Sequence, residues 1–275
     1  MDYRFEKTST APEKIKQYSE LLSEVFPETN KYTENFLDWQ YRQNPSGTVV
    51  GFDAYFGDKL VAHYVALPLE FLYNGETIKG ILALNVATHN EHRGKSLFTK
   101  LAAMTFDHGA ELGYKFATGV ANQNTSNGYI ARLGFKIIAP LDVKIFFGSP
   151  KLNSPNANFF REKWSEEKLK WRLNNPEAKY YSNNGCLSCP THIKFIDAVL
   201  SERQEFKNKG SRPKSSLFKM SIGLNLQNSK RILSVALPEK LKPSPLNLIF
   251  KPLGDFKAEI DKQNTFFELI DFDAY

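Results

Sequence analysis

The stretch His89-Asn90-Glu91-His92-Arg93-Gly94-Lys95-Ser96-Leu97-Phe98-Thr99-Lys100 decides the fold of this 275-residue chain. It follows an apolar run at residues 81–87 that is typical of a buried strand, and it opens a helix-like stretch that continues to residue 112. A strand that turns through Arg-Gly-Lys-Ser into a helix leaves unpaired N–H groups at the helix start. These donors, the helix dipole and two cationic side chains together favour an anion. The sequence therefore predicts that a phosphate or pyrophosphate binds here.

Two common phosphate loops do not fit this segment. A Walker A loop needs a glycine five positions before Gly94, where His89 stands, and the dinucleotide fingerprint needs three spaced glycines. The segment instead resembles the coenzyme A loop of the GNAT acetyltransferase superfamily, whose pattern Arg/Gln-x-x-Gly-x-Gly/Ala starts here at Arg93. Ser96 and Phe98 replace the small residues that the family often has. Ser96 still permits close backbone approach. Phe98 fits the pattern less well, and a position facing the core is one alternative for it.

A second motif follows the loop in the order that the superfamily has. Residues 115–120 form a strand pattern, and an Asn-rich turn and a short helix end at Leu133-Gly134-Phe135. Gly134 has the position of a helix C-terminal glycine, and residues 136–138 predict the next strand. Two motifs in the family's order strengthen the resemblance beyond either motif alone.

The resemblance implies an α+β fold with a GNAT-like mixed, mostly antiparallel sheet flanked by helices. The local patterns agree with it. Hairpin turns are predicted at Gly57-Asp58 and at Asn74-Gly75. The elements expected before the loop are strands at 3–7, 48–56, 59–73 and 76–87 and helices at 12–26 and 33–43.

The turn-rich stretch 148–158 predicts a domain boundary. We expect a GNAT-like acetyl-CoA-binding domain at 1–150 and a C-terminal lobe at 151–275 that forms a wall of the substrate site. Residues 37–45 and 169–176 both end a helix with a Trp, an Arg and Asn-Pro, offset by one residue. This echo indicates a degenerate second GNAT-like half, although chance similarity of two helix ends explains it too. Later strands are expected at 218–226, 231–237, 246–250 and 266–272.

The composition limits the kinds of ligand, partner and cellular location that can be expected for the chain. It has 36 basic and 30 acidic residues, a net charge of +6, which mildly favours an anionic ligand, although a solvated basic surface accounts for most of it. The basic residues are scattered and no RNA-binding motif is present, so no nucleic-acid partner is expected. No apolar run is long enough to span a membrane, the start has no signal core, and two cysteines give no disulfide framework, so we expect a cytoplasmic protein. Cys186 and Cys189 have zinc-like spacing but no second pair, so we expect no metal.

The resemblance implies that the cosubstrate is acetyl-CoA. Backbone N–H groups of the loop would hold the pyrophosphate, and residues 85–88 would pair with the pantetheine arm like an added strand. The expected cofactor-binding residues are Val86, Ala87, Thr88, Arg93, Gly94, Lys95, Ser96, Leu97, Phe98, Asn122 and Asn124. The alternatives stay open that Arg93 and Lys95 are surface charges and that the two asparagines only form a turn.

Candidate catalytic residues are few. An amine with a pKa of roughly 10 must lose a proton before attack, and His63 is the candidate base, with a hydrogen-bonded strand histidine as the alternative. Tyr129 is the candidate acid for the leaving thiolate, but it stands one position, ~100° on a helix, before the family's tyrosine, so packing is an equal explanation. Asn85 and Trp39 are expected to contact the substrate; a strand bulge and core packing are their alternatives.

Residues 87–89 and 97–101 resemble a GNAT branch associated with bacterial surface-polysaccharide synthesis. We therefore expect an N-acetyltransferase whose small-molecule amine acceptor is an amino sugar or a sugar nucleotide. Three alternatives remain at this point. They are a transferase for a peptide or another amine, a non-catalytic acyl-CoA-binding protein, and a two-lobed cell-wall aminoacyl transferase that uses aminoacyl-tRNA.

Overall fold

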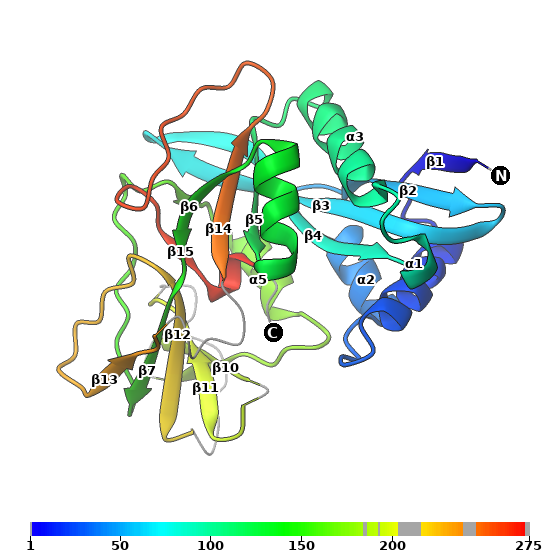
Figure 1. The fold of residues 1–275 in the computed structure, drawn as a ribbon. Coiled ribbons are helices and arrows are strands. Elements are labelled where there is room, and N and C mark those ends of the chain that lie inside the picture. Colours follow the sequence, from blue (N-terminus) through cyan, green and yellow to red (C-terminus); the bar gives the residue numbers. More distant parts are fainter. Residues whose placement is uncertain (1, 184–185, 192, 203–215, 239–245, 273–275) are drawn as a thin grey trace.

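The computed structural model describes residues 2–183, 186–191, 193–202, 216–238 and 246–272, and it contains two sheets (Figure 1). The first sheet has the order β1-β2-β3-β4-β5-β14-β6, and β8 pairs with β3. Its strands are β1 (Tyr3–Lys7), β2 (Val50–Phe56), β3 (Lys59–Tyr73), β4 (Glu76–Thr88), β5 (Phe116–Ala121), β6 (Lys136–Pro140), β8 (Arg161–Glu162) and β14 (Asn247–Pro252). Positive φ angles at Gly57, Asn74 and Gly75 confirm the two predicted hairpin turns.

Helices cover both faces of the first sheet. In Figure 1, α3 (Leu97–Glu111) lies above the sheet, and α1 (Pro12–Val25) and α2 (Glu34–Tyr41) lie below it. The apolar face of α1 and that of α2 belong to one buried cluster, whereas α3 packs into a second buried cluster. The side chain of Thr33 accepts a hydrogen bond from the Phe36 N–H and so caps the start of α2. The predicted α+β arrangement, a mostly antiparallel sheet flanked by helices, is confirmed.

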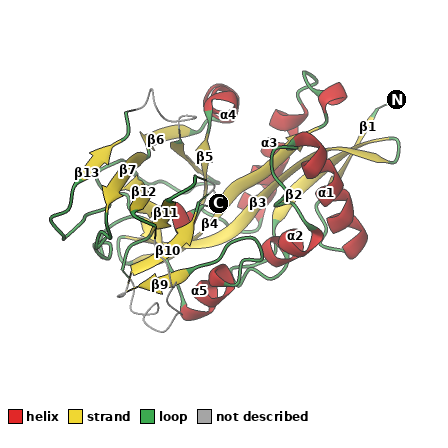
Figure 2. Cartoon of the chain, turned by 90° about the horizontal axis from the view of Figure 1, so that it is seen from below, coloured by secondary structure: helices red, strands yellow, loops and turns green. Residues whose placement is uncertain are grey.

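The second sheet has the order β13-β7-β12-β11-β10-β9, and β15 pairs with β12. Its strands are β7 (Asp142–Phe147), β9 (Tyr181–Asn183), β10 (Cys186–Pro190), β11 (Ile196–Val199), β12 (Phe218–Leu224), β13 (Ser234–Ala236) and β15 (Phe267–Glu268). The helix α5 (Glu166–Leu173) precedes β9 and packs near α2 (Figure 2). A strand expected at 266–272 is reduced to β15, because the chain turns into a 3-10 helix at Leu269–Asp271.

The two sheets repeat one connection pattern and exchange a strand. Three antiparallel strands, β2-β3-β4, are followed by β5 parallel to β4, and β9-β10-β11 are likewise followed by β12 parallel to β11. The late strand β14 then lies between β5 and β6, whereas the earlier strand β7 lies between β12 and β13 (Figure 1). A cut at residue 150 therefore does not separate the sheets, and the two-domain division stays a prediction.

The strands β4 and β5 separate where the site forms. They pair only between residues 80–82 and 116–118, and beyond these positions no pairing continues. A Cβ added at Gly80 would lie 2.3 Å from the Phe116 ring, so the close approach at the paired end requires glycine. The divergence leaves residues 83–88 of β4 with β3 as their one sheet neighbour among the described strands. Among the described residues, no helix is long and apolar enough to cross a membrane.

Candidate functional site

The loop before α3 has the backbone that the sequence predicted for an anion site. After the 3-10 turn Asn90–His92, Gly94 and Ser96 have φ angles of 75° and 59°, and these two left-handed residues turn the chain into the helix. Ser96 makes no side-chain cap. The first helical bond runs from the Lys100 N–H to the Ser96 carbonyl over 3.1 Å. The amides that precede it have no helical acceptor and can bind an anion.

A cavity of about 320 Å³ lies at this loop. It is lined by Thr88, His92, Arg93, Gly94, Ser96, Leu97, Phe98, Thr99 and Arg132. Six of the predicted cofactor residues are in this set, and Lys95 is not; its Nζ lies 5.9 Å from the ring centroid of Tyr3. Arg93 Nε donates to the Thr88 carbonyl over 3.3 Å, which holds the guanidinium beside the strand. Sequence reasoning missed Arg132, which only its position two residues before Gly134 could have suggested.

A second cavity of about 750 Å³ lies between the diverging ends of β4 and β5. It is lined by Val25, Phe26, Lys31, Tyr32, Leu82, Ala83, Leu84, Asn85, Val86, Thr88, Arg93, Phe98, Val120, Asn122, Thr125, Tyr129, Leu246 and Phe272. Three of these residues, Thr88, Arg93 and Phe98, also line the loop cavity, so the two cavities adjoin. The sequence did not point to the connection between α1 and α2 as a wall of this cavity. It did predict a substrate wall from the C-terminal lobe, and Leu246 and Phe272 of that lobe are among the lining residues.

Ala87 and Asn124, two further predicted cofactor residues, are not among the described residues that line this cavity. Ala87 is 2% exposed and pairs with His63 inside the sheet, so its side chain is covered. Asn124 lies in α4 (Gln123–Asn127), and its side chain is outside the described part of the structure. Val86 and Asn122, also predicted to bind the cofactor, line the cavity, and Asn122 Oδ1 accepts from the Thr125 N–H over 3.1 Å.

Tyr129 faces the large cavity from an unusual helical turn. It lies in a π-helical segment, Gly128–Arg132, which connects α4 to the Leu-Gly-Phe motif. A π-helix bonds residue i to i+5 and so takes up one residue more per turn than an α-helix. This wider turn can offset the one-residue shift of Tyr129 relative to the family pattern. The ring of Tyr129 packs against Phe98 and Phe135, and 5% of the residue is exposed.

A hydrogen bond 2.9 Å long joins the hydroxyls of Tyr129 and Tyr64. Burial raises the pKa of Tyr129 to about 12, while the bond from Tyr64 lowers it, and burial also raises the pKa of Tyr64 well above its usual range. Tyr64 is fully buried, and Tyr129 is the one partner of its hydroxyl among the described residues. Because a buried hydroxyl needs an acceptor, Tyr64 donates to Tyr129. The proton of Tyr129 is then directed to the cavity.

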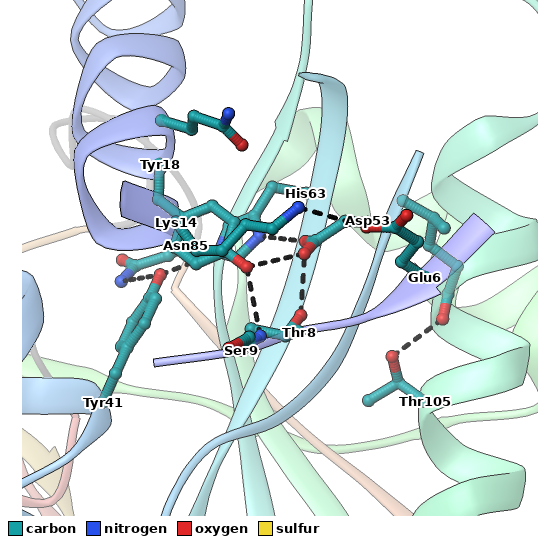
Figure 3. A network of polar contacts seen from close by, with 12 residues as sticks. Glu6, Thr8, Ser9, Lys14, Tyr18, Tyr41, Asp53, His63, Asn85 and Thr105 are labelled. Carbon is teal, nitrogen blue, oxygen red and sulfur yellow. Dashed lines mark hydrogen bonds and ion pairs between the residues drawn. The ribbon is translucent and has the colours of Figure 1, made fainter. Parts of the chain in front are cut away.

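His63, the candidate base, is fully buried and does not line either cavity. Its Nδ1 lies 2.6 Å from Asp53 Oδ1, and its Nε2 lies 2.9 Å from Tyr41 Oη (Figure 3). Tyr18 stacks on the imidazole with ring centroids 4.2 Å apart and donates to Asp53 Oδ2 over 2.7 Å. Sequence reasoning missed Asp53. The one available signal was an aspartate inside an apolar strand, at the β2 position that pairs with His63.

Asn85 and Trp39, the two expected substrate contacts, differ in placement. Asn85 lines the large cavity, and its Nδ2 donates to Gln40 Oε1 over 2.6 Å and to Tyr41 Oη over 3.0 Å. Trp39 is 3% exposed, lies outside the cavity lining and stacks on Trp171 with ring centroids 4.7 Å apart. The Trp39 ring is therefore in the core, which removes the basis for a sugar contact.

Three side chains near the loop have the composition of a metal site. Ligand atoms of His89, Glu91 and His92 lie within 4.8 Å of one another. Lys59 Nζ lies 3.0 Å from His89 Nε2, and Tyr3 Oη lies 2.8 Å from His92 Nδ1. A lysine at this distance opposes a metal ion, so we assign the two histidines to holding the loop. Of the cysteine pair, Cys189 is buried, and the Cys186 side chain is outside the described part.

Comparison with known proteins agrees with this geometry. Residues 7–138 match the model of the acetyltransferase (GNAT) domain, which spans the loop, both cavity strands and Tyr129. Residues 7–138 are assigned by this match to a GNAT acetyltransferase domain. The chain is accordingly an acyltransferase of the GNAT type, as the sequence predicted. No curated protein sequence matches the chain significantly.

The similarity of this chain to solved structures extends beyond this domain. A probable N-acyltransferase from Enterococcus faecalis has a TM-score of 0.64 at 11% identity, over 92% of this chain and 73% of its own. A GCN5-related N-acetyltransferase from Anabaena variabilis has a TM-score of 0.61 at 10% identity, over 90% of this chain and 72% of its own. A GCN5-related N-acetyltransferase from Kribbella flavida has a TM-score of 0.61 at 11% identity, over 91% of this chain and 72% of its own. At these identities the likeness establishes the fold, and it includes the C-terminal lobe.

Proposed function

We propose that this GNAT protein transfers an acetyl group from acetyl-CoA directly to a primary amine in a ternary complex. The observation that carries the proposal is that the loop cavity and the large cavity adjoin at Thr88, Arg93 and Phe98. The amides before α3 and the Arg93 guanidinium would bind the pyrophosphate. The pantetheine arm would then lie along residues 85–88, where β4 has lost its neighbour β5 and its outer edge can pair with a ligand.

The reacting groups would meet between Asn85 and Tyr129. A main-chain N–H of β4 is suited to polarise the thioester carbonyl, a kind of contact that typically contributes about 2.7–4 kcal/mol to a transition state. The coenzyme A thiolate then leaves. Because a thiol has a pKa of roughly 8.5, the Tyr129 phenol is the weaker acid. Tyr129 therefore stabilises the leaving sulfur chiefly as a hydrogen-bond donor.

The charge of the large cavity supports an acceptor that is not a polycation. The cations among its described lining residues are Lys31 and Arg93, and no aspartate or glutamate is among them. Phe26 and Tyr32 add aromatic surface at the end of the cavity near α1 and α2. An amino sugar could pack on these rings, and the phosphates of a sugar nucleotide could pair with Lys31. This is the acceptor class that we propose, and a peptide amine is the next candidate.

One observation favours a second function, that of an acyl-CoA-binding protein without turnover. No carboxylate is among the described residues that line the large cavity, and His63 is buried behind them. A site without a base can still acetylate an amine that arrives neutral, but more slowly at neutral pH. Binding and turnover must therefore be measured separately.

The test combines calorimetry with mass spectrometry. Acetyl-CoA binding is measured for the wild type, for Arg93→Glu, and for Lys136→Glu, which reverses an exposed charge on β6. Transfer is then measured on amino-sugar nucleotides, free amino sugars, peptides and aminoglycosides. We expect binding that only Arg93→Glu abolishes, with acetylation of the sugar compounds. Binding without turnover on any amine would favour the acyl-CoA-binding protein, and no binding by the wild type would reject both functions.

A further inference from the structure

Asn85 has an unusual backbone at the point where β4 meets the large cavity. Leu84 pairs with Val65 and Ala87 pairs with His63, so residues 85–86 form a bulge opposite Tyr64. The φ angle of Asn85 is 48°, in the left-handed region that asparagine tolerates better than most residues. A bulge re-aims a side chain that would otherwise follow the strand's alternation. Here it lets one side chain contact α2 and also line the cavity.

Hydrogen bonds to α2 fix which end of the Asn85 carboxamide faces the cavity. Its two amide hydrogens go to Gln40 Oε1 and to Tyr41 Oη. A carboxamide has two hydrogens on nitrogen, so these bonds use both. The Oδ1 atom has no hydrogen-bond partner among the described residues. It is therefore the atom that remains for a ligand in the cavity.

The orientation of this amide depends on a chain of bonds that runs to Asp53 (Figure 3). Tyr41 can accept from Asn85 if its own hydrogen points to His63 Nε2, 2.9 Å away. Nε2 can accept only when the imidazole proton is on Nδ1. Asp53 Oδ1, 2.6 Å from Nδ1, holds the proton there. Each donor in the series Asn85, Tyr41, His63 thus points to the next member, and Asp53 ends it.

This series of hydrogen-bonded side chains is buried from water except at Asn85. Tyr41 and His63 are fully buried, and Asp53 is 1% exposed. Asp53 also accepts from the hydroxyls of Tyr18 and Thr8, over 2.7 and 3.2 Å. Buried polar groups destabilise a core unless each one is paired. Because Tyr41, His63 and Asp53 are all paired, the series has one defined set of orientations. Asn85 is its one member that lines a cavity.

We propose that Asp53, His63 and Tyr41 are positioning residues that keep Asn85 Oδ1 directed into the cavity, where it accepts a hydrogen bond from the acceptor amine. The proposal rests on the proposed function. A carboxamide takes up no proton, so Asn85 orients the neutral amine with its lone pair toward the thioester carbon. The C–N bond forms and the C–S bond breaks. The amine gives one proton to solvent, and the coenzyme A thiolate takes one up. His63 is then an orienting residue rather than the base.

The tautomer of His63 tests the proposal without any need for turnover. Nitrogen NMR of the isotope-labelled full chain with acetyl-CoA reports which imidazole nitrogen is protonated, and His63→Gln assigns the signal. We expect the proton on Nδ1. We also expect the Asn85 carboxamide signal, assigned with Asn85→Ala, to move in Tyr41→Phe but not in Tyr55→Phe. The proposal is overturned if the proton is on Nε2, or if the chemical shift of the Asn85 carboxamide is the same in Tyr41→Phe as in the wild type.

Kinetics then test the consequence for the amine. Tyr41→Phe and Asn85→Ala should each lower kcat/KM for the amine by about tenfold, with the Kd for acetyl-CoA unchanged. The double variant should be no worse than Asn85→Ala, because Tyr41 acts through Asn85. Tyr55→Phe is the matched control, since this buried hydroxyl bonds to Gln17 and Lys14 outside the chain of bonds. Additive losses, or an equal loss in Tyr55→Phe, contradict the proposal. A wild type that binds acetyl-CoA but acetylates no amine rejects the proposed function and the amine contact, while the NMR result still decides the orientation.

Discussion

Trp39 and Trp171 make the same contact with each other in both directions. Their rings stack with centroids 4.7 Å apart and planes 15° apart, and each indole N–H donates to the other residue's carbonyl over 3.0 Å. Trp39 lies in α2 and Trp171 in α5, the two helices whose ends resemble each other in sequence. A reciprocal contact of this kind is what an approximate twofold axis between two related halves produces. Together with the exchange of β7 and β14, it favours a degenerate second GNAT-like half over chance similarity.

The stacked pair should contribute strongly to stability. Trp171→Ala removes a ring that is 6% exposed and leaves the Trp39 carbonyl without its donor. Replacement of a buried tryptophan by alanine typically lowers the free energy of unfolding by about 3–5 kcal/mol. Urea unfolding, followed by circular dichroism, measures the loss. Phe147→Ala, at a position 51% exposed, is the control and should change stability by less than about 0.5 kcal/mol. Equal effects of the two variants would show that the pair adds little.

Gly94 should be required for its backbone angle and not for lack of space. Its φ is 75°, and a Cβ added there would meet nothing within 4 Å. Gly94→Val should therefore cost about 1–2 kcal/mol from the left-handed conformation alone, expressed as weaker acetyl-CoA binding, lower stability, or both. Gly94→Asn is the matched variant, because asparagine adopts this region more readily. Calorimetric titration and urea unfolding of both variants give the comparison. If Asn is as harmful as Val, a steric role for Gly94 replaces the conformational one.

The sequence predicted the parts of this molecule that depend on neighbouring residues. The hairpin turn at Asn74 and Gly75 and the loop around Gly94 are local, because a few φ angles and one helix start determine them. The exchange of β7 and β14 could not be predicted, since β14 pairs with strands more than 100 residues earlier, and no local pattern records that choice. Asp53 was missed for a related reason. Its role depends on the register that places it opposite His63, and register is a property of two strands together.

Tyr64 and Tyr129 should respond differently to the loss of a hydroxyl. Tyr129→Phe removes the acceptor of a fully buried donor, which should cost about 1–3 kcal/mol of stability, and it also removes the donor to the leaving sulfur. Tyr64→Phe leaves Tyr129 with its hydrogen toward the cavity and should cost less. We expect kcat to fall about a hundredfold in Tyr129→Phe and no more than about tenfold in Tyr64→Phe. Steady-state kinetics measure the loss of kcat in the two variants, and urea unfolding measures their loss of stability. A larger loss of stability and of kcat in Tyr64→Phe than in Tyr129→Phe would mean that Tyr129 donates to Tyr64.

The buried tyrosines predict how stability changes at alkaline pH. Burial raises the pKa of Tyr18, Tyr41 and Tyr64, and it raises the pKa of Tyr129 to about 12. In the unfolded chain these phenols ionise near pH 10, so above that pH the folded state binds more protons than the unfolded state. Stability is therefore fully present below about pH 10. It falls as pH rises toward the folded pKa values, by about 1.4 kcal/mol per pH unit for each such tyrosine. Urea midpoints at increasing pH, with tyrosinate absorbance recorded in parallel, measure this; buried tyrosines that ionise before the protein unfolds would contradict it.

Lys31 should set the charge preference for the acceptor. Its side chain lines the end of the large cavity formed by the connection between α1 and α2, where no acidic residue is among the described lining residues. Lys31→Glu should lower kcat/KM at least about tenfold for an amine that carries phosphate, because like charges then meet at the site. The same variant should raise the relative rate with a cationic amine, while acetyl-CoA binding stays unchanged. Lys16→Glu, which reverses an exposed charge on α1, is the control and should alter neither preference. Competition between the two amines in one reaction, read by mass spectrometry, gives the ratio directly. If the ratio does not change in Lys31→Glu, the acceptor does not bring its negative charge to Lys31, and the sugar-nucleotide proposal loses its main electrostatic support.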